Sequence, residues 1–221
     1  MNIQERMTAF AMLGAGWVMW LLVGLSVLCL AVVIERGLFL WTCRDNIQKL
    51  KRDLVDRLTH GDLQGAKQQL SGSKSFEARI VTVGLESAQA GAASAEERMA
   101  GESSASRLQM ERYLAFLGTV GNNAPFIGLL GTVIGVIRAF QSLESSAGRV
   151  SEGLMAEIGE ALVATAIGIL VALPAVAFYN YFQRVVKSRL SQADAMGREV
   201  LAYLKTQTKA STLSSRPTRV D

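Results

Sequence analysis

Three long runs without a charged residue organise the chain. They cover residues 7–34, 113–137 and 161–183. At about 1.5 Å of rise per residue, even the shortest run would span roughly 34 Å as a helix, which exceeds a hydrocarbon core of about 30 Å. The hydrophobic pattern therefore predicts three transmembrane helices.

Between the first and second runs, hydrophobic positions recur at helical spacing. Leu50, Leu54 and Leu58 are separated by charged residues, which is the pattern of an amphipathic helix. We expect this helix to continue straight from the first membrane helix. Gly61 should end it, and Asp62 should cap a short helix that follows.

A capping signature marks the helix that leads into the second run. Ser94 and Glu97 have the spacing of a capping box. No helix-breaking residue lies between them and the second run, so we expect one unbroken helix to pass from this region into the membrane. The same holds after the third run, where hydrophobic residues continue at helical intervals to about Leu204.

These patterns predict an all-α membrane protein with long helical extensions. Residues 1–10 fit a short interfacial helix, although a frayed polar terminus fits nearly as well. The remaining expected segments are transmembrane helices at 11–36, 113–138 and 158–183, a cytoplasmic helical region at 37–112, a short periplasmic connection at 139–157, a cytoplasmic helical extension at 184–205 and a disordered tail at 206–221.

Charge gives these helices a direction. The chain has 23 Lys and Arg against 19 Asp and Glu, and the basic residues concentrate in the first long loop and the tail. The positive-inside rule assigns both to the cytoplasm, which places the N-terminus outside and the C-terminus inside. The bases are mixed with acids and no nucleic-acid-binding motif accompanies them, so we expect no nucleic-acid partner.

Catalytic signatures are missing from the sequence. It contains no GxxxxGK[ST], GxSxG or HExxH motif and no GxGxxG that follows a strand pattern. The single histidine, His60, cannot build a metal site alone, and Cys29 and Cys43 are expected to be free thiols. We therefore expect neither an enzyme nor a bound metal or cofactor.

The second run is too polar for a simple lipid anchor. Gly128, Gly131 and Gly135 allow close approach of a neighbouring helix, and the last two have GxxxG spacing. Helix packing explains that spacing, and so would a dimerisation or gating role. Pro125 should kink the helix and free the carbonyl near Gly121, which one of the two preceding asparagines could satisfy.

The third run is also polar and carries a stripe of small residues that includes Gly168, with Pro174 further along. Thr165 lies five residues inside Glu160, and Thr132 lies six residues inside Arg138. If the two helices are antiparallel, both threonines lie about 7.5–9 Å below the membrane edge. In an oligomer they could form a hydroxyl ring, but each hydroxyl could instead bond to a carbonyl of its own helix.

Glu160 admits two interpretations. It could form a salt bridge with Arg138 at the membrane edge, or it could be a carboxylate on a proton path. Glu160 and Thr165 lie about 140° apart around an ideal helix, so they cannot both point straight into one narrow pore. Arg36, which closes the first run, is a second candidate for a partner contact or an edge ion pair.

Several motifs resemble the ExbB/TolQ proton-channel family, which is more distantly related to MotA. They are the segments Asn123-Ala-Pro-Phe-Ile-Gly-Leu-Leu-Gly-Thr-Val133, Ile158-Gly-Glu-Ala-Leu-Val-Ala-Thr-Ala-Ile-Gly168 and Leu173-Pro-Ala-Val176, with Ile34-Glu-Arg36 at the end of the first run. The resemblance covers essentially the whole chain in topology. Three spans rather than four disfavour MotA itself.

The resemblance implies a stator subunit of a proton-motive-force-driven motor in the bacterial inner membrane. It implies a homopentamer around a single-span ExbD/TolR-like protein whose membrane aspartate carries protons. The work would be done on a TonB- or TolA-like envelope protein, a gliding apparatus or another envelope effector. Thr132 and Thr165 match the family's pore threonines, and Glu160 matches its intramembrane glutamate. Ile134 replaces a tryptophan that is common there. The alternative function is a non-conducting membrane scaffold or assembly protein.

Overall fold

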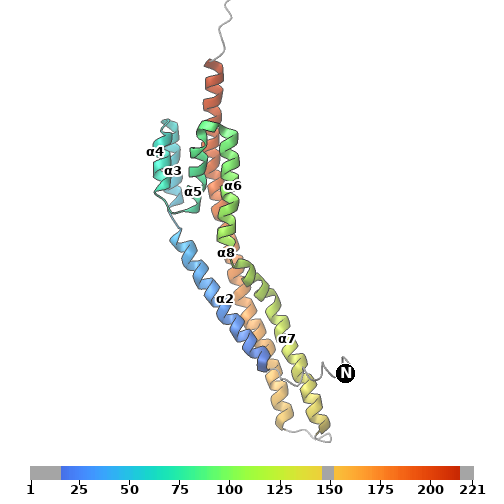
Figure 1. Ribbon diagram of the computed structural model, residues 1–221. Helices are drawn as coiled ribbons and strands as arrows, with labels where there is room; N and C mark the ends of the chain where they lie inside the picture. Colours follow the sequence, from blue (N-terminus) through green and yellow to red (C-terminus); the bar gives the residue numbers. More distant parts are fainter. Residues whose placement is uncertain (1–15, 146–151, 215–221) are drawn as a thin grey trace, which may run out of the picture. The chain divides into compact units, whose positions relative to one another are not determined.

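The computed structural model describes residues 16–145 and 152–214, and it confirms the all-α prediction. Within these residues every regular element is a helix, with no strand. In chain order the elements (Figure 1) are α2 Gly16–Thr42, α3 Ile47–Thr59, α4 Leu63–Ser71, α5 Phe76–Glu86, the 3-10 helix η1 Ala88–Ala90, α6 Ala92–Glu111, α7 Leu114–Ser145 and α8 Glu152–Ser214.

The chain divides into two compact units. We call residues 16–36, 113–145 and 152–182 the apolar unit, and residues 37–112 and 183–214 the polar unit. Both α2 and α8 contribute residues to each of them.

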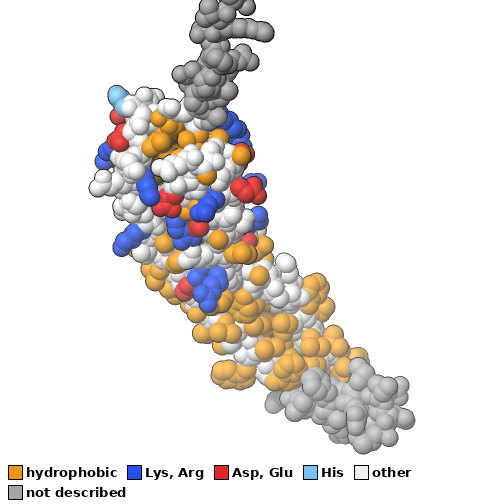
Figure 2. All heavy atoms as spheres, turned by 45° about the horizontal axis from the view of Figure 1, so that its top comes forward, with side chains coloured by type: hydrophobic (Ala, Val, Ile, Leu, Met, Phe, Trp, Pro, Cys, Tyr) orange, Lys and Arg blue, Asp and Glu red, His pale blue; other side chains and the backbone are white. Residues whose placement is uncertain are grey.

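The apolar unit is built from three helices that can each cross a membrane. By length and composition α2, α7 and α8 all qualify as transmembrane segments. They pack around a shared cluster whose buried residues are Val18, Leu22, Cys29, Val120, Ala124, Ile134, Val171, Ala172 and Ala175. Large hydrophobic side chains such as Val27, Phe126 and Leu170 point outward and are 62%, 68% and 70% exposed. Figure 2 shows this hydrophobic surface, which is typical of a membrane protein.

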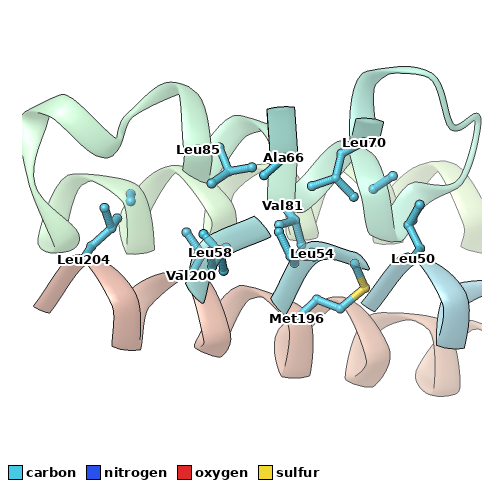
Figure 3. Close-up of a cluster of buried hydrophobic side chains, with 12 residues drawn as sticks. Leu50, Leu54, Leu58, Ala66, Leu70, Val81, Leu85, Met196, Val200 and Leu204 are labelled. Atoms are coloured by element: carbon cyan, nitrogen blue, oxygen red, sulfur yellow. The ribbon is translucent and has the colours of Figure 1, made fainter. Parts of the chain in front are cut away.

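The polar unit has an independent hydrophobic core. The predicted amphipathic stripe of α3, Leu50, Leu54 and Leu58, is buried there. These leucines pack with residues of α4, α5 and α8, as Figure 3 shows, and the cluster contains Leu50, Leu54, Leu58, Ala66, Leu70, Ala78, Val81, Leu85, Ala95, Met196, Val200 and Leu204. Charged side chains lie on the outer faces of its helices (Figure 2). One stretch of α8 therefore supplies one wall of this core.

The predicted turn between α3 and α4 is confirmed. Gly61 has a φ of 76°, in the left-handed region where glycine avoids a Cβ clash. The Asp62 side chain accepts a hydrogen bond from the Gly65 backbone N–H and caps α4. Both residues act at the positions that the sequence indicated.

Two predicted continuous helices are broken. The helix expected to run from the first membrane segment to Gly61 stops at Thr42. A new helix, α3, starts at Ile47, and the side chain of Asn46 caps it by accepting a hydrogen bond from the Lys49 backbone N–H. The second break separates α6 from α7, where Tyr113 has a φ of 64°. Neither break involves glycine or proline, so the pattern of helix breakers did not reveal them.

Other boundaries also differ from expectation. The capping box of Ser94 and Glu97 does not start α6, because that helix begins at Ala92 with Gly91 at its N-cap. Most of the expected connection at 139–157 is helical, since α7 extends to Ser145 and α8 starts at Glu152. The same α8 continues to Ser214, into the segment expected to be disordered. The predicted interfacial helix at 1–10 lies outside the described residues.

Candidate functional site

Backbone contact between α7 and α8 is the central feature of the apolar unit. A Cβ built on Gly128 would lie 2.8 Å from the Ala164 carbonyl oxygen and 2.9 Å from the Thr165 Cα. A Cβ built on Gly168 would lie 2.7 Å from the Ala124 carbonyl oxygen. Only glycine allows two helices to approach this closely, so the small residues are packing residues at this contact.

The same contacts set the register of the two antiparallel helices. Gly131 faces Ala164, and Gly135 faces Ala161. Thr132 follows Gly131 on α7, and Thr165 follows Ala164 on α8. Because the helices run in opposite directions, the two threonines lie within about two residues of rise, or about 3 Å, along the axis. The expected match in depth therefore agrees with the register of the contacts.

The two threonine hydroxyls differ in their bonding. Thr132 Oγ1 donates to the Leu129 carbonyl oxygen over 2.7 Å, which is the local bond that the sequence left open as an alternative. Thr165 Oγ1 is buried and has no hydrogen-bond partner among the described residues. Buried polar atoms normally have one, so this hydroxyl is the better candidate for a contact with water or a passing proton.

Glu160 does not carry the salt bridge that its position suggested. Arg138 Nη2 lies 4.0 Å from an oxygen of Glu157, one turn earlier on α8. Glu160 is partly buried, and its Oε1 would lie 3.6 Å from a Cβ built on Gly16 at the start of α2. The carboxylate of Glu160 thus sits where α8 passes α2.

The sequence interpretation missed Glu157. It shares a helical face with Ala161, Ala164 and Gly168, since these four residues follow one another at intervals of four, three and four. This helical spacing could have identified Glu157 as a residue on the face of α8 that contacts α7. Glu157 Oε2 is buried and has no hydrogen-bond partner among the described residues.

The two prolines lie inside helices, as expected. Pro125 is within α7 and Pro174 within α8. The Asn123 side chain does not satisfy the carbonyl freed at Gly121, because its Nδ2 donates to the Thr119 carbonyl oxygen over 2.7 Å. The asparagine thus bonds to its own helix one turn back, which lowers the cost of placing an amide in an apolar run.

Arg36 is buried at the end of the α2 segment of the apolar unit, with 3% of its surface exposed. It forms an ion pair with its neighbour Glu35. Its guanidinium carbon also lies 5.5 Å from the centre of the Tyr113 ring, within the range of a cation–π interaction. Tyr113 is the residue with the left-handed backbone, so its unusual conformation coincides with a contact to a buried charge.

Arg189 is the second buried arginine, and it belongs to the polar unit. It donates to the carbonyl oxygens of Leu40 and Cys43 over 2.6 and 3.0 Å. The last carbonyls of a helix have no partner within it, and a cation at this end also complements the helix dipole. Arg189 therefore caps the C-terminus of α2 from α8.

Near this cap lie two acidic residues whose pKa values are displaced in opposite directions. Burial raises the pKa of Glu77, although its backbone hydrogen bond and the charge of Arg189 oppose the rise. Hydrogen bonds from the Ser73 hydroxyl and the Asn46 backbone N–H lower the pKa of Asp45. Glu77 is 2% exposed, so its ionised form is costly in the folded state.

Replacing Glu77 with glutamine is expected to stabilise the protein at neutral pH. Because the folded-state pKa of Glu77 is raised, its contribution to stability is full below the unfolded-state pKa and is lost as the pH rises through the folded-state value. The gain in thermal midpoint of Glu77→Gln should therefore be largest near about pH 8 and should vanish toward about pH 4. Thermal unfolding in detergent across this range measures it.

Asp45→Asn provides the control of opposite sign. The lowered pKa of Asp45 contributes stability above its unfolded-state pKa that is lost as the pH falls. This variant should be less stable than the wild type at neutral pH and equal to it in acid. A Glu77→Gln gain that does not change with pH would contradict the assignment.

No metal cluster is found among residues 16–145 and 152–214, where no three His, Cys, Asp or Glu side chains come together as ligands. The chemistry that this arrangement supports is proton exchange at carboxylates and hydroxyls. The relevant groups are Glu157, Glu160 and Thr165 on α8 and Thr132 on α7. Of these, the structure gives Glu157 and Thr165 buried oxygens without a hydrogen-bond partner in the described part of the chain.

A comparison with protein families assigns more than half of the chain. Residues 72–195 match the model of the MotA/TolQ/ExbB proton channel family. The matched region includes all of α7 and the part of α8 that carries the glutamates and the threonine. It therefore contains the contact described above.

Individual relatives match over shorter regions. The chain is 43% identical over 77 residues to the ExbB-like 2 biopolymer transport protein of Helicobacter pylori, which is 35% of this chain and 51% of the relative. It is 42% identical over 91 residues to the biopolymer transport protein ExbB of Neisseria gonorrhoeae, 41% of each chain. It is 43% identical over 74 residues to the Tol-Pal system protein TolQ of Pseudomonas aeruginosa, 34% of this chain and 32% of the relative. The matches thus span about half or less of the length of these relatives.

Proposed function

The chain belongs to the MotA/TolQ/ExbB proton channel family, and from that premise we propose that it is the stator subunit of a proton-motive-force-driven motor of the ExbB/TolQ type. In this proposal it resides in the bacterial inner membrane with its N-terminus outside. It assembles as a homopentamer around a single-span protein that carries a membrane aspartate. Proton flow then does work on an envelope protein of the TonB or TolA kind.

One observation carries the proposal for this chain. The buried hydroxyl of Thr165 has no hydrogen-bond partner among the described residues, although it lies on a helix held in backbone contact with α7. A threonine that only packs would bond to its own helix, as Thr119 does on α7. A hydroxyl left available at a tight helix contact suits a water-filled proton path that forms when copies assemble.

Removal of this hydroxyl tests the proposal. Thr165→Val keeps the shape of the side chain and is expected to lower proton flux at least about tenfold, because the path loses a donor and acceptor. Flux is measured in proteoliposomes that hold the chain with its single-span partner, with a pH-sensitive dye inside. Liposomes with this chain alone give the baseline, since the proposal assigns the proton-carrying aspartate to the partner.

Thr119→Val is the matched control. Its hydroxyl is on α7, is exposed and donates to the Ala115 carbonyl oxygen over 2.9 Å, so this variant should conduct like the wild type. Alanine at Glu160 and Thr132 extends the series. If Thr132→Ala, Glu160→Ala and Thr165→Val all assemble and keep full flux, the proton-path assignment is wrong and a non-conducting scaffold is the better function.

A further inference from the structure

The pair of Arg138 and Glu157 joins α7 and α8 near their ends. Arg138 Nη2 and Glu157 Oε1 are 4.0 Å apart, and the two side chains are 34% and 24% exposed. A Cβ built on Gly135 would lie 3.3 Å from the Glu157 carbonyl oxygen. The pair therefore adjoins the last close glycine contact between the two helices.

Glu157 lies on the side of α8 that faces α7. Ala161 and Ala164 lie on the same helical face and contact Gly135 and Gly131. With about 100° of rotation per residue, Glu157 and Thr165 lie about 80° apart around α8, whereas Glu160 and Thr165 lie about 140° apart. Glu157 is therefore closer than Glu160 to the direction of the available threonine hydroxyl.

The second oxygen of Glu157 is not explained by the ion pair. Oε2 is buried and has no hydrogen-bond partner among the described residues. A buried carboxylate oxygen without a donor is costly unless water or a proton reaches it. A residue that served only to tie the helices together would gain by having this oxygen satisfied as well.

We propose that Glu157 is a second proton-binding carboxylate of α8 and that Arg138 positions it. Along the helix axis Glu157 precedes Glu160, and Thr165 follows both. The inference rests on the proposed function. A proton leaves a hydronium ion and forms an O–H bond at Glu157, and that bond then breaks as a water or the Glu160 carboxylate accepts the proton. Glu160 is three residues further on, about 4.5 Å along the axis, so the two residues are neighbours on the surface of the helix.

The charged groups around Glu157 suit a relay. Arg138 of α7 places a positive charge 4.0 Å from one carboxylate oxygen of Glu157. Glu160 of the same helix, which lies against the start of α2 at Gly16, provides a second carboxylate that can accept it. The relay thus runs from Glu157 at the α7–α8 contact to Glu160 beside the start of α2.

The experiment measures proton flux through the complex of this chain and its single-span partner in proteoliposomes. Glu157→Gln keeps the side-chain shape but cannot carry a proton, so we expect flux to fall at least about tenfold. Glu157→Asp keeps the carboxylate and should retain flux within about threefold. Size-exclusion profiles and thermal midpoints are measured for each variant.

The exchanged pair separates a relay from a simple tie between helices. Arg138→Glu with Glu157→Arg keeps opposite charges at the two positions but moves the carboxylate from position 157 of α8 to position 138 of α7. The relay predicts that this double variant assembles and conducts poorly, whereas wild-type flux in it would overturn the inference. Full flux in Glu157→Gln, or failure of that variant to assemble, would also overturn it.

The outcome is distinguishable from failure of the proposed function. If Thr165→Val loses flux while Glu157→Gln keeps it, only the role of Glu157 is wrong. If the wild-type complex carries no protons above the baseline of liposomes with this chain alone, the proposed function itself is wrong.

Discussion

Replacing Gly128 with alanine is expected to force α7 and α8 apart and to lower the thermal midpoint by about 2–12 °C. The new Cβ would lie 2.8 and 2.9 Å from backbone atoms of Ala164 and Thr165. A backbone cannot turn away as a flexible side chain does, so the helices must separate. Overpacking of this kind costs about 1–3 kcal/mol or more, which corresponds to several degrees for a chain of this size.

Gly159→Ala is the matched control. Gly159 is also within an apolar-unit helix, but a Cβ built there meets nothing within 4 Å. Alanine favours a helix interior over glycine by about 1 kcal/mol, so this variant should be as stable as the wild type or slightly more so. Circular dichroism in detergent measures both midpoints. Equal midpoints for Gly128→Ala and the wild type would show that the close contact does not hold the two helices.

The Gly128 variant should also lose proton flux. Displacement of α8 changes the position of Thr165, which directly follows the Ala164 contact. Loss of flux here with normal flux in Gly159→Ala would link the glycine contact to the proton path. This comparison uses the same liposome measurement as the threonine variants.

Replacing Arg189 with methionine should destabilise the polar unit by about 2–4 kcal/mol. Methionine fills much of the same volume but leaves the carbonyls of Leu40 and Cys43 without their donor. Each unsatisfied buried carbonyl costs about 1–3 kcal/mol. Chemical denaturation monitored by circular dichroism gives the free energy of unfolding.

Two further variants define what Arg189 contributes. Arg189→Lys keeps the charge but not the two-pronged donor geometry, so it should recover only part of the loss. Arg198→Ala is the control on the same helix, because Arg198 is exposed and pairs with Asp194 one turn away. Its removal should change stability by less than about 0.5 kcal/mol. A similar loss in both arginine truncations would refute the capping role of Arg189.

The helix breaks show how local patterns can mislead. Hydrophobic spacing identified α3 correctly, but nothing in the four residues before Ile47 resembles a strong breaker apart from the capping preference of Asn46. The break is stabilised from a distance, since Arg189 binds the free carbonyls of Leu40 and Cys43. A residue almost 150 positions away in the sequence thus completes the end of α2.

The site was predicted unevenly for a similar reason. Glycine and alanine spacing showed that α7 and α8 could approach closely, and counting from the charged ends placed Thr132 and Thr165 at one level. Ion pairing, however, depends on the direction in which each side chain leaves its helix as well as on its depth in the membrane. An ion pair between Arg138 and Glu160 was one of the two interpretations left open by the sequence, but the rotation of α8 brings Glu157 to Arg138 instead.

The sequence by itself determined the all-α class and the three membrane helices, because these follow from uncharged length and from helical periodicity. Small residues also indicated the packing faces of the second and third membrane helices. It also contained the motifs of the family. Only the tertiary structure decided which polar atoms are satisfied: Thr132 bonds to its own helix, while Thr165 and one oxygen of Glu157 have no hydrogen-bond partner among the described residues. Hydrogen bonding requires positions within about 3 Å, and residues far apart in the chain set those positions.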